Sequence, residues 1–264
     1  MSFRRTAFSL IELSIVLVIL GLLTGGILAG QSLIRASELR SVITDATKYR
    51  TAVSAFRDKY FALPGDMPNA TSVWGARACS LADNTLPVAT ETCNGNDDGS
   101  ISWGLPDTTH GESFLAWQHL SSAGLIGGNY SGLQGPGTYA ASEVGGLNVP
   151  SLRLNSGCIG LHGIGSGATN IIPTANSMNP NVTSGNVLLL GKTVGSNPDY
   201  CYGAEFTPMD AWNIDTKMDD GVAYSGKMFA WVRANCTTNT TPGSGDYLLT
   251  YSNPICALML RLDV

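Results

Sequence analysis

The hydrophobic pattern begins with a short polar leader and becomes almost entirely apolar over residues 8–30, where Glu12 is the only charged residue. A helix of this length is about 35 Å long at 1.5 Å per residue, which exceeds the ~30 Å hydrocarbon core of a bilayer. Residues 8–30 are therefore predicted to span a membrane. Arg4 and Arg5 precede the segment and no equal basic density follows it directly, so we expect the amino terminus in the cytoplasm and the remainder exported.

A cleavable secretory signal peptide is the alternative interpretation, because the segment ends in the small-residue sequence GGILAG. Glu12 argues against this alternative. A carboxylate inside a membrane helix costs about 2.5–3.5 kcal/mol on insertion scales, so it is treated as a functional group that needs a cationic partner. The other possibility is a plain membrane anchor with an incidental Glu12 near the cytoplasmic interface.

The pattern becomes amphipathic over residues 31–62, where apolar side chains recur at helical spacing. This stripe consists of Leu33, Leu39, Val42, Ile43, Ala46, Tyr49, Val53, Phe56 and Tyr60. One helix is thus predicted to continue from the membrane to about Tyr60. Pro64 and Gly65, in the sequence LPGDMP, are expected to end it.

Residues 63–264 combine further helices with strands and many turns. One helix is predicted from Thr109, as its amino-terminal cap, to Gly124, and another from Thr207 and Pro208 to Gly221. Four segments have the composition of strands, namely 186–194, 226–233, 246–252 and 256–264. The Gly- and Asn-rich segment 127–186 is interpreted as an insertion.

Composition restricts the class of function. Charged residues make up 13% of the chain and the formal net charge is −5, with no basic run after Arg57, so nucleic-acid binding is not expected. The three histidines, His110, His119 and His162, do not lie beside a nucleophile motif, and the sequence HGIGSGATN matches neither a nucleophile elbow nor a phosphate loop. We therefore do not expect an enzyme.

The cysteines indicate an oxidising compartment, because all six follow the apolar segment and none forms a C-x-x-C pair. Six cysteines allow fifteen connectivities, and the sequence alone does not select one. Pairing between sequence neighbours is favoured, with buried free thiols as the alternative. The expected pairs are Cys79–Cys93, Cys158–Cys201 and Cys236–Cys256.

The sequence AFSLIELSIVLVILGLL resembles the processing signal of type IV pilins and type II secretion pseudopilins, which has a short basic leader, a small residue, Phe and this apolar core. The resemblance implies that a prepilin peptidase cleaves between Ala7 and Phe8 and methylates the new amino group of Phe8. Glu12 then becomes the fifth residue of the mature chain and pairs with the Phe8 ammonium, usually that of a neighbouring subunit. The family more often has Gly where this chain has Ala7.

The same resemblance implies an α+β, pilin-like fold, in which the long helix packs on a disulfide-bonded, loop-rich antiparallel β domain. The domains would be a leader (1–7), a transmembrane half-helix (8–30), an amphipathic half-helix (31–62) and an exported domain (63–264). The chain would be a structural subunit of a pilus or pseudopilus filament, assembled from the bacterial inner membrane. Its partners would be other pilin subunits, the peptidase and an inner-membrane assembly platform. The alternatives are a minor or tip pseudopilin that primes assembly or contacts cargo, and a membrane-anchored periplasmic binding module or hydrolase.

Two acidic segments are candidate calcium sites, and some pseudopilins bind calcium in their exported domain. The sequence CNGNDDGSI places Asn94, Asn96 and Asp98 at the alternate positions of a calcium loop, although the twelfth position is Leu105 instead of Glu. The second candidate is Asp215, Asp219 and Asp220. The competing interpretations are an Asx turn held by the Cys79–Cys93 disulfide and a carboxylate-rich turn.

Overall fold

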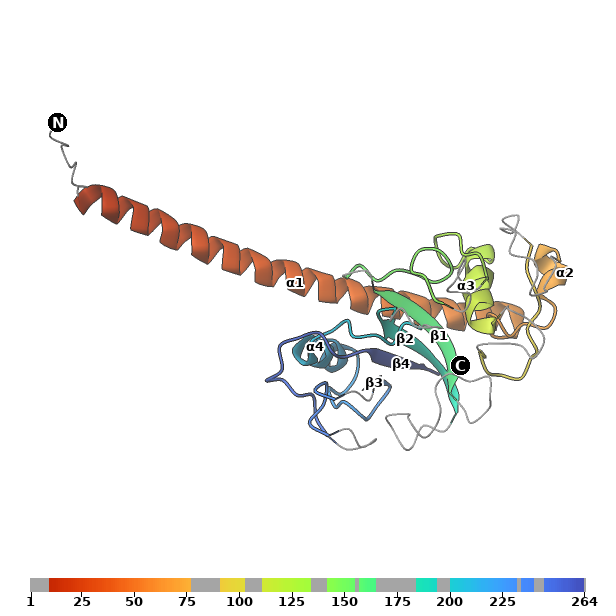
Figure 1. The fold of residues 1–264 in the computed structure, drawn as a ribbon. Helices are drawn as coiled ribbons and strands as arrows, with labels where there is room; N and C mark the ends of the chain where they lie inside the picture. The colour runs from red at the N-terminus through yellow and green to blue at the C-terminus, as the bar shows by residue number, and fades with distance from the viewer. Residues whose placement is uncertain are drawn as a thin grey trace. The chain divides into compact units, whose positions relative to one another are not determined.

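The computed structural model shows an α+β protein with a long amino-terminal helix and an antiparallel sheet (Figure 1). It divides into two units, Met1–Arg40 and Ser41–Val264. The residues that the structure describes are 10–76, 91–102, 111–133, 142–154, 157–164, 184–193, 200–231, 234–239 and 245–263.

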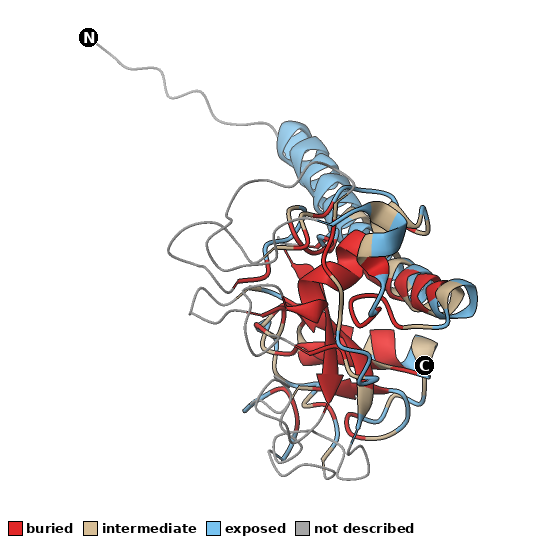
Figure 2. Ribbon diagram, turned by 90° about the vertical axis from the view of Figure 1, so that its right-hand side faces the viewer, coloured by how far each residue is buried: buried red, intermediate tan, exposed pale blue. Residues whose placement is uncertain are grey.

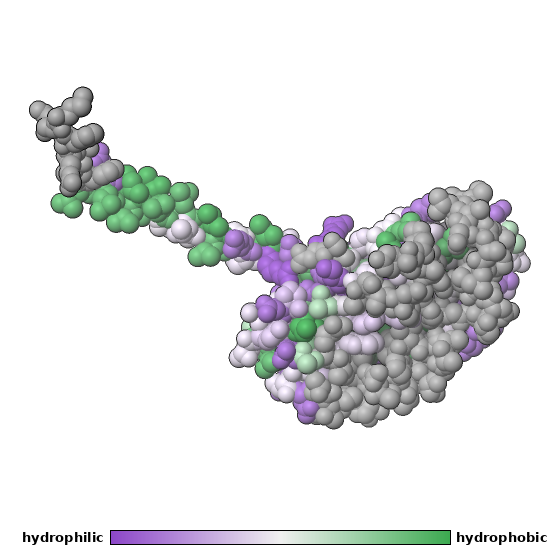
Figure 3. Space-filling model, in the orientation of Figure 1, coloured by the Kyte–Doolittle hydropathy of each residue, from purple (hydrophilic) through white to green (hydrophobic). Residues whose placement is uncertain are grey.

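Helix α1 runs from Leu10 to Tyr60, which confirms the predicted single helix and its end. Residues 10–29 are exposed, and their surface is apolar (Figures 2 and 3). This helix is the part of the described chain that is long and apolar enough to cross a membrane. From Ser41 onward one face of α1 is buried, and its largest side chains are those of Val42, Tyr49, Val53 and Phe56.

The two hydroxyl groups within this exposed apolar segment are satisfied by the helix itself. Ser14 Oγ donates to the carbonyl of Ile11 at 2.9 Å, and Thr24 Oγ1 donates to the carbonyl of Leu20 at 2.9 Å. Such bonds remove most of the cost of placing hydroxyls in lipid. Glu12 is therefore the only side chain of residues 10–29 that carries a charge.

The sheet has four strands in the order β1-β2-β4-β3, and all neighbours are antiparallel. Its strands are β1 (Cys158–Ile164), β2 (Gly185–Gly191), β3 (Met228–Ala230) and β4 (Leu258–Leu262). Leu188 of β2 lies opposite both Leu161 of β1 and Leu260 of β4. Nearly every strand residue is buried, which explains the continuous apolar sequences of β2 and β4.

Helix α3 (Glu112–Ser122) contacts strand β1, and its aromatic side chains contact those of α1. The rings of Tyr49 and Trp117 meet edge to face at 5.1 Å, and Phe56 stacks on His119 at 6.2 Å. Trp117 and Phe56 are among the largest fully buried side chains. The core of Ser41–Val264 thus includes the carboxyl-terminal half of α1.

Of the two predicted amino-terminal helix caps, Thr207 is confirmed, whereas Thr109 lies outside the described residues. Helix α4 (Pro208–Met218) has Thr207 as its cap, with a capping box to Asp210, although it ends before Gly221. Helix α3 was predicted to begin after Thr109, which lies outside the described residues; its cap is Gly111. Glu112 is the first residue of α3, and its carboxylate accepts hydrogen bonds from the Asn96 and Ser102 N–H groups.

Three predictions about secondary structure were incomplete or wrong. Residues 246–252 form turns with one isolated bridge, because Tyr247 directs its hydroxyl to Asp215 while Leu249 is 41% exposed. Strand β1 lies inside the segment that was interpreted as an insertion, and its glycines hid it from a composition-based prediction. The short helix α2 (Ala70–Trp74) was not predicted.

The disulfides agree with two of the expected pairs. Cys158 is bonded to Cys201 and Cys236 to Cys256, with Cα–Cα distances of 5.4 and 5.1 Å. Cys93 is also disulfide-bonded, whereas its expected partner Cys79 lies outside the described residues. Disulfides in this region agree with folding in an oxidising compartment.

Candidate functional site

Glu12 lies in the first turn of α1, within the exposed apolar surface. The unpaired N–H groups at a helix amino terminus carry partial positive charge, which favours a carboxylate there. Ala7 and Phe8, the expected processing residues, lie outside the described residues. Glu12 therefore lies on a continuous helix, Leu10–Tyr60.

The predicted calcium loop, residues 94–101, is folded by side-chain bonds to its own backbone. Asn96 Oδ1 accepts from the Asp98 N–H at 3.0 Å, and Asp98 Oδ1 accepts from the Ser100 N–H at 2.9 Å, which makes two consecutive Asx turns. Asn94 Oδ1 instead accepts from the Thr71 N–H of α2 at 2.9 Å. The side chain of Asn94 therefore bonds to α2, whereas those of Asn96 and Asp98 bond within the loop.

Asp98 is instead close to two carboxylates that the sequence analysis missed, Asp66 and Glu112, with oxygens from all three within 4.8 Å of one another. Asp66 accepts from the N–H groups of Asp98 at 3.1 Å and Gly99 at 2.9 Å. Glu112 accepts from the N–H groups of Asn96 at 3.0 Å and Ser102 at 2.9 Å. These bonds attach the 94–101 loop to Glu112 at the start of α3 and to Asp66 in the segment after α1.

Burial dominates the electrostatics of this cluster. It raises the pKa of Asp66 to about 6 and that of Glu112 to about 7, although the N–H donors partly oppose the shift. Oxygen ligands suit calcium, but every carboxylate oxygen of the cluster already accepts a hydrogen bond. The contacts favour the Asx-turn interpretation, and calcium binding stays a prediction.

The raised pKa values predict that stability falls as pH rises. A folded state with raised carboxyl pKa values binds more protons than the unfolded chain between about pH 4 and pH 7, so the free energy of unfolding decreases across this range. We expect Glu112→Gln to make the stability less dependent on pH, with the exposed Asp97→Asn as the control. Denaturant unfolding of the full chain in detergent at pH 5, 6 and 7.5 measures this. A stability that rises from pH 5 to 7.5 would contradict the prediction.

The second predicted acidic group is assembled by the turn after α4. Asp215, Asp219 and Asp220 have oxygens within 4.8 Å of one another. Asp215 accepts from the Tyr247 hydroxyl at 2.8 Å, and burial raises its pKa to about 7. Asp219 accepts from the Met228 N–H at 2.9 Å, so this group also fastens the turn to β3. These bonds support the interpretation as a carboxylate-rich turn.

A buried ionisable pair is the third notable arrangement, and nothing in the sequence pattern indicated it. His162 Nε2 on β1 lies 2.8 Å from Glu143 Oε1, although the two atoms do not have hydrogen-bond geometry, and both side chains are at most 1% exposed. Glu143 Oε2 accepts from the Cys201 N–H at 2.8 Å. A Cβ at Gly160 would lie 2.6 Å from the imidazole and 2.7 Å from the carboxylate, so β1 has glycine there.

No family model, curated protein or solved structure matches this chain. The apolar helix with Glu12 is the strongest candidate for a functional site, since the carboxylates of the acidic clusters already bond to the backbone of neighbouring segments. This helix combines an extended apolar surface with one carboxylate near its amino-terminal end.

Proposed function

We propose that the chain is a structural subunit of a type IV pilus or type II secretion pseudopilus-like filament. In this proposal a prepilin peptidase processes the chain between Ala7 and Phe8, and an inner-membrane platform assembles it with other pilin subunits. The observation that carries the proposal is one helix, Leu10–Tyr60, whose apolar segment holds a single carboxylate and whose other end belongs to the core of a disulfide-bonded α+β domain.

The energetics of Glu12 support assembly over simple anchoring. A carboxylate near the end of an apolar helix is costly in a lone subunit, and pairing with an ammonium group removes much of that cost. The Phe8 amino group of a neighbouring subunit would supply this cation. Docking of subunits is then favoured by the same charge that penalises the isolated chain.

Mass spectrometry of the mature protein tests the proposal directly. We expect a chain that begins with N-methylated Phe8, because the leader and the FSLIEL sequence match the processing signal. Loss of the leader removes two arginines and changes the formal net charge from −5 to −7. Cells that lack prepilin peptidase are the control and should retain Met1. A chain that starts at Met1 in cells with an active peptidase would exclude this function.

A further inference from the structure

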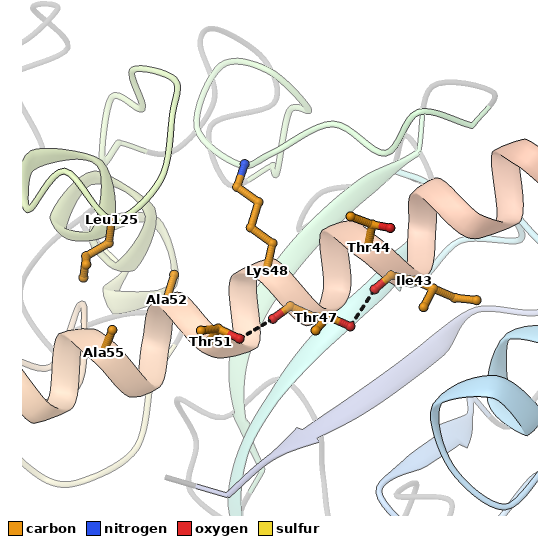
Figure 4. A pocket seen from close by; sticks show the side chains of 8 residues that line it. All are labelled: Ile43, Thr44, Thr47, Lys48, Thr51, Ala52, Ala55 and Leu125. Carbon is orange, nitrogen blue, oxygen red and sulfur yellow. Dashed lines mark hydrogen bonds between the residues drawn. The ribbon is translucent and has the colours of Figure 1, made fainter.

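A shallow apolar groove runs along α1 in the exported unit (Figure 4). Its volume is about 600 Å³. Leu125 faces Ala52 and Ala55 across it, and the Thr47 and Thr51 hydroxyls are bonded to helix carbonyls. The lining residues are Ile43, Thr44, Thr47, Lys48, Thr51, Ala52, Ala55 and Leu125.

Phe61, directly after α1, is the most exposed large apolar side chain of the described residues, at 91%. Its φ is 56°, and its N–H donates to the carbonyl of Arg57 at 2.8 Å, which is the left-handed ending that helices usually form with glycine. A bulky residue is strained in this conformation. The chain therefore holds a phenyl ring in water at a position where glycine would be more stable, and such strain points to a function.

The surroundings of the ring and of the groove have opposite charges. Phe61 borders a hollow whose described lining also includes three carboxylates, Asp66, Asp97 and Asp98, and one cation, Arg57. Among the described residues that line the groove, Lys48 is an exposed cation and none is a carboxylate; Asp45, three residues earlier on α1, lies near enough to Lys48 for their charges to interact. We infer that Phe61 of one copy inserts into the groove of the next copy, with Asp97 and Asp98 facing Lys48. This inference rests on the proposed filament and identifies one of its contacts.

The contact is heterologous, since the ring and the groove share no residue and one copy can use both at once. The centre of the groove lies about 15–20 Å before Phe61 along the axis of α1, at 1.5 Å per residue. A heterologous contact of this kind repeats in one direction, and it builds an open helical array unless the rotation closes a ring. Repeated docking of Phe61 into the groove of the next copy would thus build a linear assembly of the Ser41–Val264 units.

Photo-crosslinking in cells that assemble the full chain tests the contact. A photoreactive benzoyl-phenylalanine at position 61 is expected to form a light-dependent dimer, and peptide mapping should place the adduct on residues 43–55 or on Leu125. The same probe at position 73, on the exposed face of α2, is the control. An adduct elsewhere on the second copy, or assembled subunits without an adduct, would overturn the inference while leaving the filament in place. Absence of any self-association would overturn both.

Phe61→Gly separates docking from folding. Glycine relieves the left-handed strain, so the melting temperature should stay the same or rise, while the loss of a buried phenyl group should weaken docking about tenfold or more. The readout is the yield of crosslinked oligomer at equal membrane level and processing, with Val73→Ser as the matched control. Thr47→Phe, which fills the groove, should lower the yield equally. Unchanged yields in both variants would overturn the inference.

Discussion

Glu12→Leu is expected to leave the protein in the membrane at its normal level and to abolish assembly. Leucine is more favourable than a carboxylate in lipid, so insertion should be preserved or improved. In the proposed filament, docking by contrast would lose the charge that pairs with the Phe8 ammonium of a neighbouring subunit. If about 2.5–3.5 kcal/mol of burial cost is relieved by docking, its loss weakens assembly by roughly two orders of magnitude.

The measurement compares membrane level, processing and the yield of sheared or crosslinked filaments between the wild type and Glu12→Leu. Ser14→Leu is the matched control, because it also removes a polar side chain from the segment but no charge. Ser14 already bonds to its own helix, so this variant should assemble normally.

Equal assembly of wild type and Glu12→Leu would contradict the charge-pairing role and would favour a plain membrane anchor. Normal membrane level with lost assembly would support it.

Glu143→Ala is expected to lower the free energy of unfolding by about 3–5 kcal/mol. Removal of the carboxylate leaves the buried imidazole of His162 without the polar group that lies 2.8 Å from its Nε2, and such a loss is costly inside a protein. The Cys201 N–H also loses its acceptor, which adds the penalty of an unsatisfied buried donor. Among the substitutions proposed within Ser41–Val264, this one should lower the stability most.

Denaturant unfolding of the full chain in detergent measures this effect. Asp263→Ala, which breaks the exposed Lys227–Asp263 pair, is the control and should cost no more than about 1 kcal/mol. The double variant Glu143→Leu, His162→Leu should recover the part of the loss that comes from breaking the pair, since apolar pairs often replace buried polar pairs at little cost, whereas the Cys201 N–H still lacks its acceptor. A loss below about 1 kcal/mol for Glu143→Ala would show that the pair contributes little to stability.

Features that depend on neighbours within one helical turn could be read from the sequence. The apolar segment and the amphipathic stripe predicted α1 and its end near Tyr60, because helical periodicity needs only residues three and four apart. The Thr207 cap with Pro208 predicted the start of α4 for the same reason. The apolar sequences of β2 and β4 were also recognisable as strands.

Features that depend on distant residues were decided by the tertiary structure. Strand β1 forms although glycine disfavours strands, because its partner β2 and the Glu143–His162 pair require close approach at Gly160. Asp66 and Glu112 reach the 94–101 loop from distant parts of the chain, and residues 246–252 turn because Tyr247 bonds to Asp215. The local sequence pattern determines which helices and strands can form. Burial, and the need to pair every buried polar group, decide which of them form and which distant residues they bring into contact.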